Sequence, residues 1–189
     1  MKSINYLPLF ILLSLAACKK DPTKNAKLPP ATQEGKNTIG FTLNGEVWVP
    51  YAKCGAFSNP CQEAQVSYGE AGGAQLNGID FSFTRRRQGV NTASYLYITS
   101  TGVGTITTLG NKIDSVYVNY TAENSIGNND TYSGGIPVSK FVITKFDKQN
   151  QIISGEFEFI LRENNGSGKT TILKDGRFDF RFNTCKCSE

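Results

Sequence analysis

The side chains of this chain that could do chemistry are carboxylates, lysines, tyrosines and cysteines, because its 189 residues include no histidine. The absence of histidine excludes a Ser-His-Asp triad, a Cys-His nucleophile pair and a histidine zinc site. An enzyme built on this sequence would need carboxylates, lysine, tyrosine or a cofactor. The sequence shows no catalytic set, metal site or cofactor motif, so we expect a protein without catalysis, metal or cofactor.

Tyrosines at alternate strand positions form the pattern that best fits ligand binding. Tyr95 and Tyr97 share one face of a predicted strand, while Tyr117 and Tyr120 lie on opposite faces of another. Exposed aromatic rings can stack on the apolar face of a sugar. A basic run follows a third strand and could meet an acidic glycan or phosphate. The candidate ligand face is Tyr95, Tyr97, Tyr117, Arg85, Arg86 and Arg87, although core packing and a solvated turn explain the same residues without a ligand.

A pair of carboxylates supports an alternative hypothesis, a carboxylate-dependent glycan hydrolase. Glu156 and Glu158 point the same way on a predicted strand, at a separation not far from that of paired glycosidase carboxylates. Such pairs are also ordinary on the wet face of a sheet. The Gly166–Thr171 segment lacks the first glycine and the following helix of a phosphate-binding loop, and predicts a hairpin loop instead.

The amino terminus has the order of a secretory signal peptide. Lys2 supplies the charge, residues 7–15 form an apolar run too short to span a membrane, and two alanines precede Cys18. The tetrapeptide Leu15-Ala16-Ala17-Cys18 resembles the lipobox of bacterial lipoproteins, in which the cysteine sulfur is acylated after cleavage. We therefore expect residues 1–17 to be removed and Cys18 to anchor the chain to a membrane through lipid.

Residues 18–37 are rich in Lys, Pro, Thr and Asn and contain little that could be buried, so they predict a flexible lipidated tether. Residues 38–189 then form one domain. The net charge of +4, or +3 once Lys2 leaves with the leader, is too mild to indicate nucleic-acid binding.

The four remaining cysteines predict two disulfides, because their number is even and the compartment is oxidising. They are Cys54, Cys61, Cys185 and Cys187. We favour cross-pairing between the first two and the last two, with local pairs as the alternative, since Cys185 and Cys187 lie near the limit for bridging each other on an extended chain. Their spacings do not resemble a zinc knuckle.

The composition favours an all-β fold, with 19 Gly, 12 Phe and 8 Tyr but one Trp and one Met. An Asn-Gly pair at 44–45 predicts a hairpin. Short strands between turns predict a β-sandwich, jelly-roll or immunoglobulin-like, of about nine or ten strands. At most one short helix is expected, around residues 60–65. The strand candidates are residues 38–43, 46–50, 64–68, 78–85, 94–100, 104–109, 113–121, 140–147, 152–162, 170–173 and 176–183.

Three strands with strict alternation predict the core. Their inward sets are Ile79, Phe81 and Phe83; Phe157, Phe159 and Leu161; and Phe178, Phe180 and Phe182. The segment at 123–137 is long for a loop and is therefore suspected of function.

Two stretches resemble a family of Bacteroidota outer-membrane lipoproteins that has no assigned activity. The first is Leu-Pro-Pro-Ala-Thr-Gln at 28–33, leading into Asn-Gly-Glu-Val-Trp-Val-Pro at 44–50. The second is the pair of closing strands at 155–159 and 175–180. The resemblance implies an outer-membrane lipoprotein with a β-sandwich. It supplies no catalytic residue.

These observations together predict a non-enzymatic binding or structural module of the cell envelope, facing the periplasm or the cell surface. Its partner would be a glycan or an envelope protein. A subunit of a surface assembly is a third hypothesis.

Overall fold

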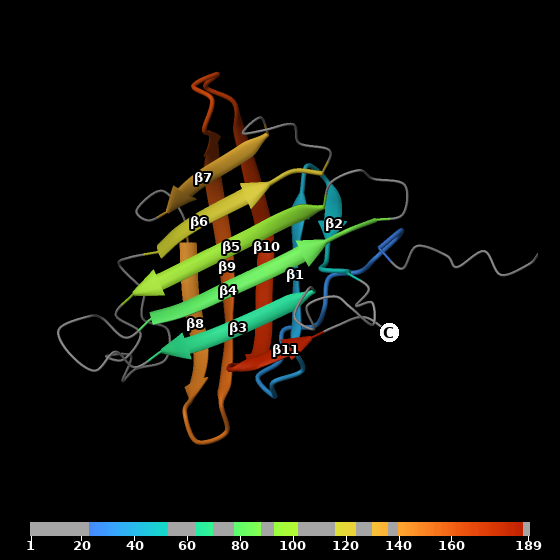
Figure 1. The fold of residues 1–189 in the computed structure, drawn as a ribbon. Coiled ribbons are helices and arrows are strands. Elements are labelled where there is room, and N and C mark those ends of the chain that lie inside the picture. Colours follow the sequence, from blue (N-terminus) through green and yellow to red (C-terminus); the bar gives the residue numbers. More distant parts are fainter. Residues whose placement is uncertain are drawn as a thin grey trace, which may run out of the picture.

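The computed structural model describes residues 23–52, 63–69, 78–87, 93–101, 116–123, 130–135 and 140–186. These residues form eleven β-strands and no helix, which confirms the all-β prediction (Figure 1). The strands are β1 (Thr38–Leu43), β2 (Glu46–Trp48), β3 (Ala64–Gly69), β4 (Gly78–Arg85), β5 (Ser94–Thr101), β6 (Val116–Thr121), β7 (Thr131–Gly135), β8 (Lys140–Asp147), β9 (Ile152–Glu163), β10 (Thr170–Arg181) and β11 (Thr184–Lys186).

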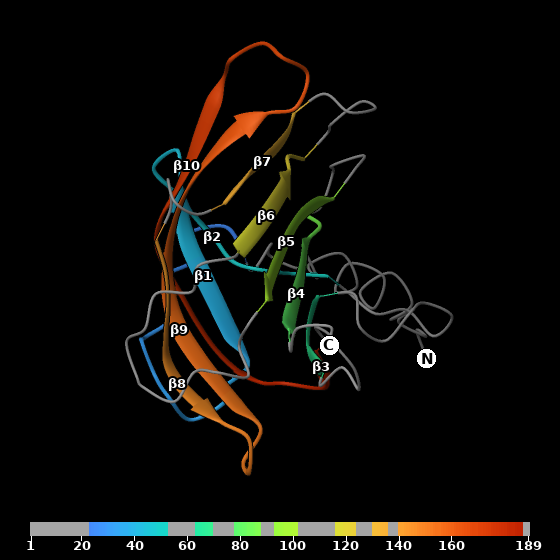
Figure 2. The ribbon, with the colours of Figure 1, turned by 90° about the vertical axis from the view of Figure 1, so that its left-hand side faces the viewer.

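All strands belong to one antiparallel sheet that curls over itself into a sandwich. The order is β11-β3-β4-β5-β6-β7-β9-β10-β1-β2, and β8 pairs with β9. Seen edge-on, β3 to β7 form one layer and β8, β9, β10 and β1 form the other (Figure 2). Pairing of Tyr132 with Glu163 joins the layers where β7 meets β9. Strands adjacent in the chain mostly pair with each other, so the sandwich is ordered as a meander.

The three alternating aromatic sets fill the space between the layers, as predicted. None of their nine side chains is more than 3% exposed. The ring of Phe81 on β4 lies 5.1 Å from that of Phe178 on β10, and Phe83 lies 5.4 Å from Phe180. Each such burial contributes about 1.5–3 kcal/mol, so these contacts hold the two layers face to face.

Several elements differ from the sequence prediction. Ala64 and Gln65, which the sequence placed both at the end of a short helix and in the strand candidate at 64–68, belong to β3, as the strand candidate predicts. β10 runs unbroken through residues 174 and 175, because a bulge with Asp175 at φ 53° keeps the strand paired with β9. The strand candidate at 104–109 lies outside the described residues.

β7 lies inside the segment that we expected to be a loop, because its Ser-Gly-Gly sequence has the composition of a turn. Gly134 allows this strand to approach β9 closely. A Cβ atom at this position would lie 2.8 Å from the carbonyl oxygen of Ile160. The glycine that suggests a loop is therefore what permits the strand pairing.

The segment before β1 is bound to the sandwich, although its composition predicts a flexible tether up to residue 37. Residues 32–36, which we call the strap, cross the outer face of β9 and β10 at Asp179. The carboxylate of Asp179 accepts hydrogen bonds from the Thr32 hydroxyl (2.5 Å) and from the backbone amides of residues 34, 35 and 36 (2.8–3.2 Å). Ser154 Oγ donates a further bond of 2.8 Å.

These bonds leave Asp179 only 1% exposed and still charged. Burial by itself raises the pKa of its carboxyl, but the donors of Thr32, Ser154, Gly35 and Lys36 outweigh it, so the pKa lies below the ordinary 3.8. Composition could not reveal this contact, because most of the donors are backbone amides.

We predict that Asp179→Asn lowers the free energy of unfolding by about 2–4 kcal/mol, because charge-assisted hydrogen bonds are lost and donors are left unpaired. Since the folded pKa is depressed, this stabilisation is present above about pH 4 and disappears as the pH falls through the folded pKa. Urea denaturation from pH 7 to pH 2 measures it. The difference in the free energy of unfolding between wild type and Asp179→Asn should become smaller at acid pH. The exposed Asp175→Asn control should have a free energy of unfolding close to that of wild type at every pH.

Candidate ligand-binding face

The three predicted tyrosines lie together on the outer face of the β3–β7 layer. Tyr97 and Tyr117 are 45% and 55% exposed, respectively. Tyr97 pairs with Asn119 across β5 and β6, which places Tyr117 diagonally beside it on the same face. The Tyr95 ring stacks against Tyr97 with centroids 6.2 Å apart and planes 16° apart. We call this surface the tyrosine face.

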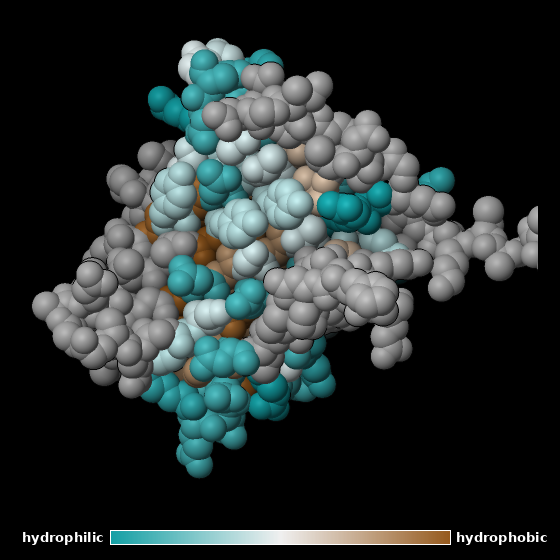
Figure 3. Space-filling view, viewed as in Figure 1, coloured by the Kyte–Doolittle hydropathy of each residue, from teal (hydrophilic) through white to brown (hydrophobic). Residues whose placement is uncertain are grey.

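Small polar side chains surround these rings in rows that cross the strands. One row is Ser82, Tyr97, Asn119 and Ser133, and a second is Thr84, Tyr95, Thr121 and Thr131. A view onto this layer shows side chains of intermediate hydropathy over the middle of β4, β5 and β6 (Figure 3). The rows supply hydroxyl and amide groups that donate and accept hydrogen bonds. The face thus combines flat rings with neutral polar groups.

Tyr120 occupies the opposite side of β6, as the alternation predicts. It is 4% exposed and packs into the core. Burial raises the pKa of Tyr120 to about 12, partly opposed by the nearby positive charge of Arg85. The alternation in β6 therefore divides its tyrosines between a solvent-exposed face and the interior.

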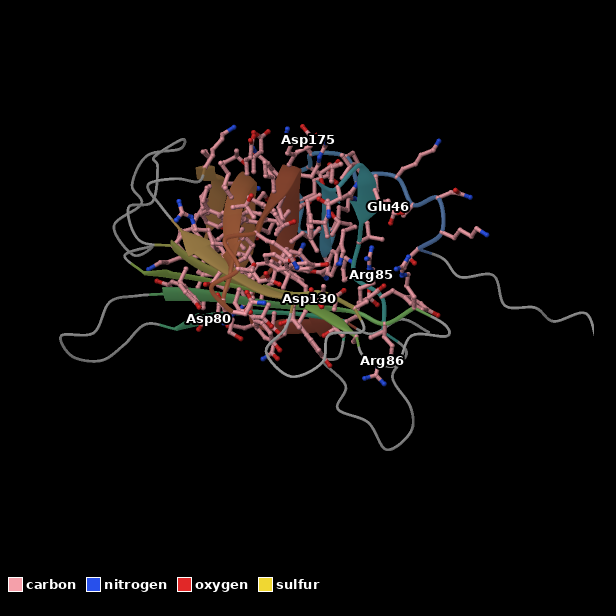
Figure 4. The ribbon with its side chains drawn as sticks, turned by 90° about the horizontal axis from the view of Figure 1, so that it is seen from above. Glu46, Asp80, Arg85, Arg86, Asp130 and Asp175 are labelled. Atoms are coloured by element: carbon pink, nitrogen blue, oxygen red, sulfur yellow. The ribbon has the colours of Figure 1, made fainter. Side chains whose placement is uncertain are left out.

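The three consecutive arginines do not form one basic surface. Arg85 points into the space between the layers, whereas Arg86 is exposed and points away from it (Figure 4). Arg87 turns back to form an ion pair with Glu123. Of the three, only Arg86 points to the side of the sheet that carries the tyrosines, because side-chain direction alternates at the end of β4.

Arg85 is held in a buried cluster that sequence analysis did not identify. Its side chain is 8% exposed and that of Glu123 is 7% exposed, with Arg85 Nε 3.1 Å from Glu123 Oε1. The guanidinium also lies 5.3 Å from the centre of the Trp48 ring. Burial lowers the pKa of Arg85, and the Glu123 carboxylate opposes that shift. Glu123 is the first residue of the segment predicted to be a loop, so the sequence pattern did not identify it as the ion-pair partner of Arg85.

Trp48 is fully buried beside this cluster. Its indole Nε1 donates a 3.1 Å hydrogen bond to Ser94 Oγ, and its ring stacks on Phe41 with centroids 4.8 Å apart. Ser94 lies at the start of β5, so Trp48 joins β2 to the layer that carries the tyrosine face.

The paired carboxylates lie on the opposite layer. Glu156 and Glu158 project from the outer face of β9 into an open groove of about 220 Å³, which Asp175 and Arg177 also line. Lys140 Nζ lies 3.4 Å from Glu156, and these two side chains are more than half exposed. Among the described residues, no cluster of three or more acidic or cysteine side chains could hold a metal ion.

The cysteines fall almost entirely outside the described residues. Four of them are outside the described residues, namely Cys18, Cys54, Cys61 and Cys187. Cys185 lies on β11, where its backbone pairs with Gln65 of β3. β11 thus runs beside the strand that begins three residues after Cys61, an arrangement that cross-pairing would need. The disulfide pairing remains a prediction.

Comparisons with protein-family models, curated proteins and solved structures found no match to this chain. None of the described residues belongs to a helix with the length and apolar character needed to cross a membrane.

We predict that Glu123→Gln lowers the free energy of unfolding by about 3–5 kcal/mol, since it leaves the buried Arg85 without its counter-charge. Glu158→Gln is the matched control on an exposed strand position and should change stability by no more than about 0.5 kcal/mol. Thermal and urea unfolding of both variants measure the difference. Equal stability of the two variants would contradict a structural role for the Arg85–Glu123 pair.

Proposed function

We propose that this protein is a non-enzymatic glycan-binding module of the cell envelope, held to a membrane by lipid on Cys18. The observation that carries the proposal is the grouping of Tyr95, Tyr97 and Tyr117 on one solvent-facing surface. Exposed apolar groups that lie side by side on a surface often mark an interaction site, so the exposure of Tyr97 and Tyr117 on neighbouring strands favours a binding role.

The geometry of the tyrosine face suits a sugar chain. Tyr97 and Tyr117 are diagonal neighbours on paired strands, and such positions lie roughly 7–8 Å apart. Two rings at this separation can contact the apolar faces of one sugar or of neighbouring sugars. Asn119 and Ser82 flank Tyr97 and offer hydrogen bonds to sugar hydroxyls. The neutral, polar character of these rows favours an uncharged glycan over a phosphate-rich partner.

The carboxylate-dependent hydrolase fits the described residues less well. Glycosidases keep one carboxyl protonated by shielding it from water and cations. Glu156 instead pairs with Lys140 in solvent. The groove that holds this pair also lies on the opposite layer from the tyrosines. Glycan binding without hydrolysis is therefore the function we propose, and glycan hydrolysis is the alternative that the assay below tests.

The location of the protein is part of the proposal and rests on the sequence. The Leu15-Ala16-Ala17-Cys18 motif and the resemblance to Bacteroidota lipoproteins support an outer-membrane lipoprotein. Several acyl chains on one cysteine make anchoring durable, because each buried methylene contributes about 0.8 kcal/mol. A module on this anchor would capture glycan at the envelope.

We predict that Tyr97→Ala and Tyr117→Ala each weaken glycan binding about tenfold, or ~1.4 kcal/mol, because a stacking ring is removed. Wild type is first screened against a neutral glycan array, and the best ligand is then titrated calorimetrically into each variant. Ile172→Ala is the matched control, since Ile172 is 36% exposed on the other layer. Unchanged affinity in both tyrosine variants would exclude the tyrosine face as the site.

The same glycans are assayed for hydrolysis in parallel. Product formation that disappears in Glu156→Gln would support the hydrolase instead. Co-purification with one fixed partner, and no glycan binding, would indicate a subunit of a surface assembly.

We predict that Cys18→Ser abolishes incorporation of labelled fatty acid and moves the protein from the membrane to the soluble fraction. Cell fractionation and mass spectrometry of the mature amino terminus measure both effects. Retention of an unmodified leader in wild type would contradict the anchor. Protease treatment of intact cells then distinguishes the cell surface from the periplasm.

A further inference from the structure

A cavity of about 580 Å³ lies beside the buried arginine, away from the tyrosine face. It is lined by residues 23–26, by residues 45–47 at the β1–β2 turn, and by Arg85 and Arg87. This volume lies within the range of 300–1,000 Å³ that is usual for small-molecule sites. The cavity can therefore hold an organic ligand the size of a sugar.

The charges around this cavity favour an anion. Lys24, Arg85 and Arg87 line it together with one carboxylate, Glu46. A second carboxylate, that of Glu123, does not line the cavity but forms ion pairs with Arg85 and Arg87. Three positive groups against two negative ones leave one positive charge, which a singly charged ligand would balance.

Arg85 supplies the specific feature of the site. Its side chain is 92% buried, and its Nε is used by Glu123. Its two terminal nitrogens make no hydrogen bond to the residues that the structure describes. Buried donors without an acceptor are costly, and a guanidinium presents its donors as a planar fork that matches a carboxylate. Figure 4 shows Arg85 directed between the layers, on the side where β2 carries Glu46.

We infer that this cavity binds the carboxylate of a sugar acid, such as a uronic acid. The terminal nitrogens of Arg85 donate to the carboxylate, and Lys24 and Arg87 add positive charge. Glu46 accepts hydrogen bonds from the sugar hydroxyls. The Glu46 carboxylate would repel a doubly charged phosphate, so the lining favours a ligand with one negative charge and several hydroxyls. This site is independent of the proposed tyrosine face, which points to the opposite side of the same layer.

Fluorescence of the single tryptophan tests the inference, because Trp48 lies against Arg85. D-glucuronate is titrated into the full chain in detergent, with heat measured in parallel. We expect saturable binding that changes Trp48 emission. D-glucose, which has the same ring without the carboxylate, should bind at least tenfold more weakly. Inorganic phosphate and acetate serve as the anion controls.

Two variants locate the site. Arg85→Lys keeps the charge opposite Glu123 but removes the fork, and should weaken glucuronate binding roughly tenfold. Lys24 lies in the segment before the strap, so Lys24→Ala should weaken glucuronate binding up to about fivefold without loss of folding. The Tyr97→Ala, Tyr117→Ala double variant should bind glucuronate as wild type does. Unchanged glucuronate binding in this double variant would show that the cavity binds glucuronate whether or not the tyrosine face binds a glycan.

Three outcomes of the ligand titrations would overturn the inference, and so would one outcome of the variants. One is no saturable binding of glucuronate. Another is equal binding of glucuronate and glucose, because the carboxylate would then not be recognised. The last is tighter binding of phosphate or acetate than of glucuronate, because the cavity would then attract small anions in general. Loss of binding in the tyrosine variant but not in Arg85→Lys would assign the sugar acid to the tyrosine face instead.

Discussion

Aromatic packing between the two layers is the interaction on which the rest of this structure depends. Phe81 and Phe83 of β4 contact Phe178 and Phe180 of β10 across the sandwich, and Phe141 of β8 stacks on Phe178 with centroids 5.5 Å apart. Because side chains alternate along a strand, burying these rings fixes the direction of every other residue on the same strands. A shift of one residue in register would expose the phenylalanines and bury the polar rows.

Two buried charged side chains, Asp179 and Arg85, lie next to this aromatic packing. Asp179 is on the outer side of β10, where the strap supplies backbone donors, and Arg85 ends β4, where Glu123 supplies the opposite charge. In both places a charged side chain is removed from water and compensated by atoms from a distant part of the chain. These contacts tie the amino-terminal segment and the end of β6 to the sandwich. They therefore extend the ordered body beyond the strands themselves.

A sheet that buries one face so completely leaves the other face available for recognition. On the β3–β7 layer that outer face carries tyrosines among serines, threonines and asparagine, and on the β9–β10 layer it carries mostly charged residues. The first surface suits stacking on neutral sugars, whereas the second resembles an ordinary solvated face. The cavity at Arg85 differs from both, because it lies beside the β1–β2 turn and the guanidinium of Arg85 is withdrawn from water. The tyrosine face and the cavity are thus two chemically distinct surfaces at which we propose ligand binding.

The sequence by itself determined the all-β class, most strand positions and the three core sets. It also placed Tyr95 and Tyr97 on one face of a strand and Tyr117 and Tyr120 on opposite faces of another. These follow from strict alternation of aromatic and polar residues, a local property of each strand. Tertiary structure decided which strands are neighbours, and so placed Tyr117 diagonally beside Tyr97. It also turned Arg85 inward to Glu123, made a strand of Ser133-Gly134-Gly135, and bound residues 32–36 to Asp179. The contacts to the two buried charges join residues far apart in the chain: Arg85 and Glu123 are 38 positions apart, and Thr32 and Asp179 are 147 positions apart. No local pattern encodes them, because each exists only once the layers have closed and a buried charge requires a partner.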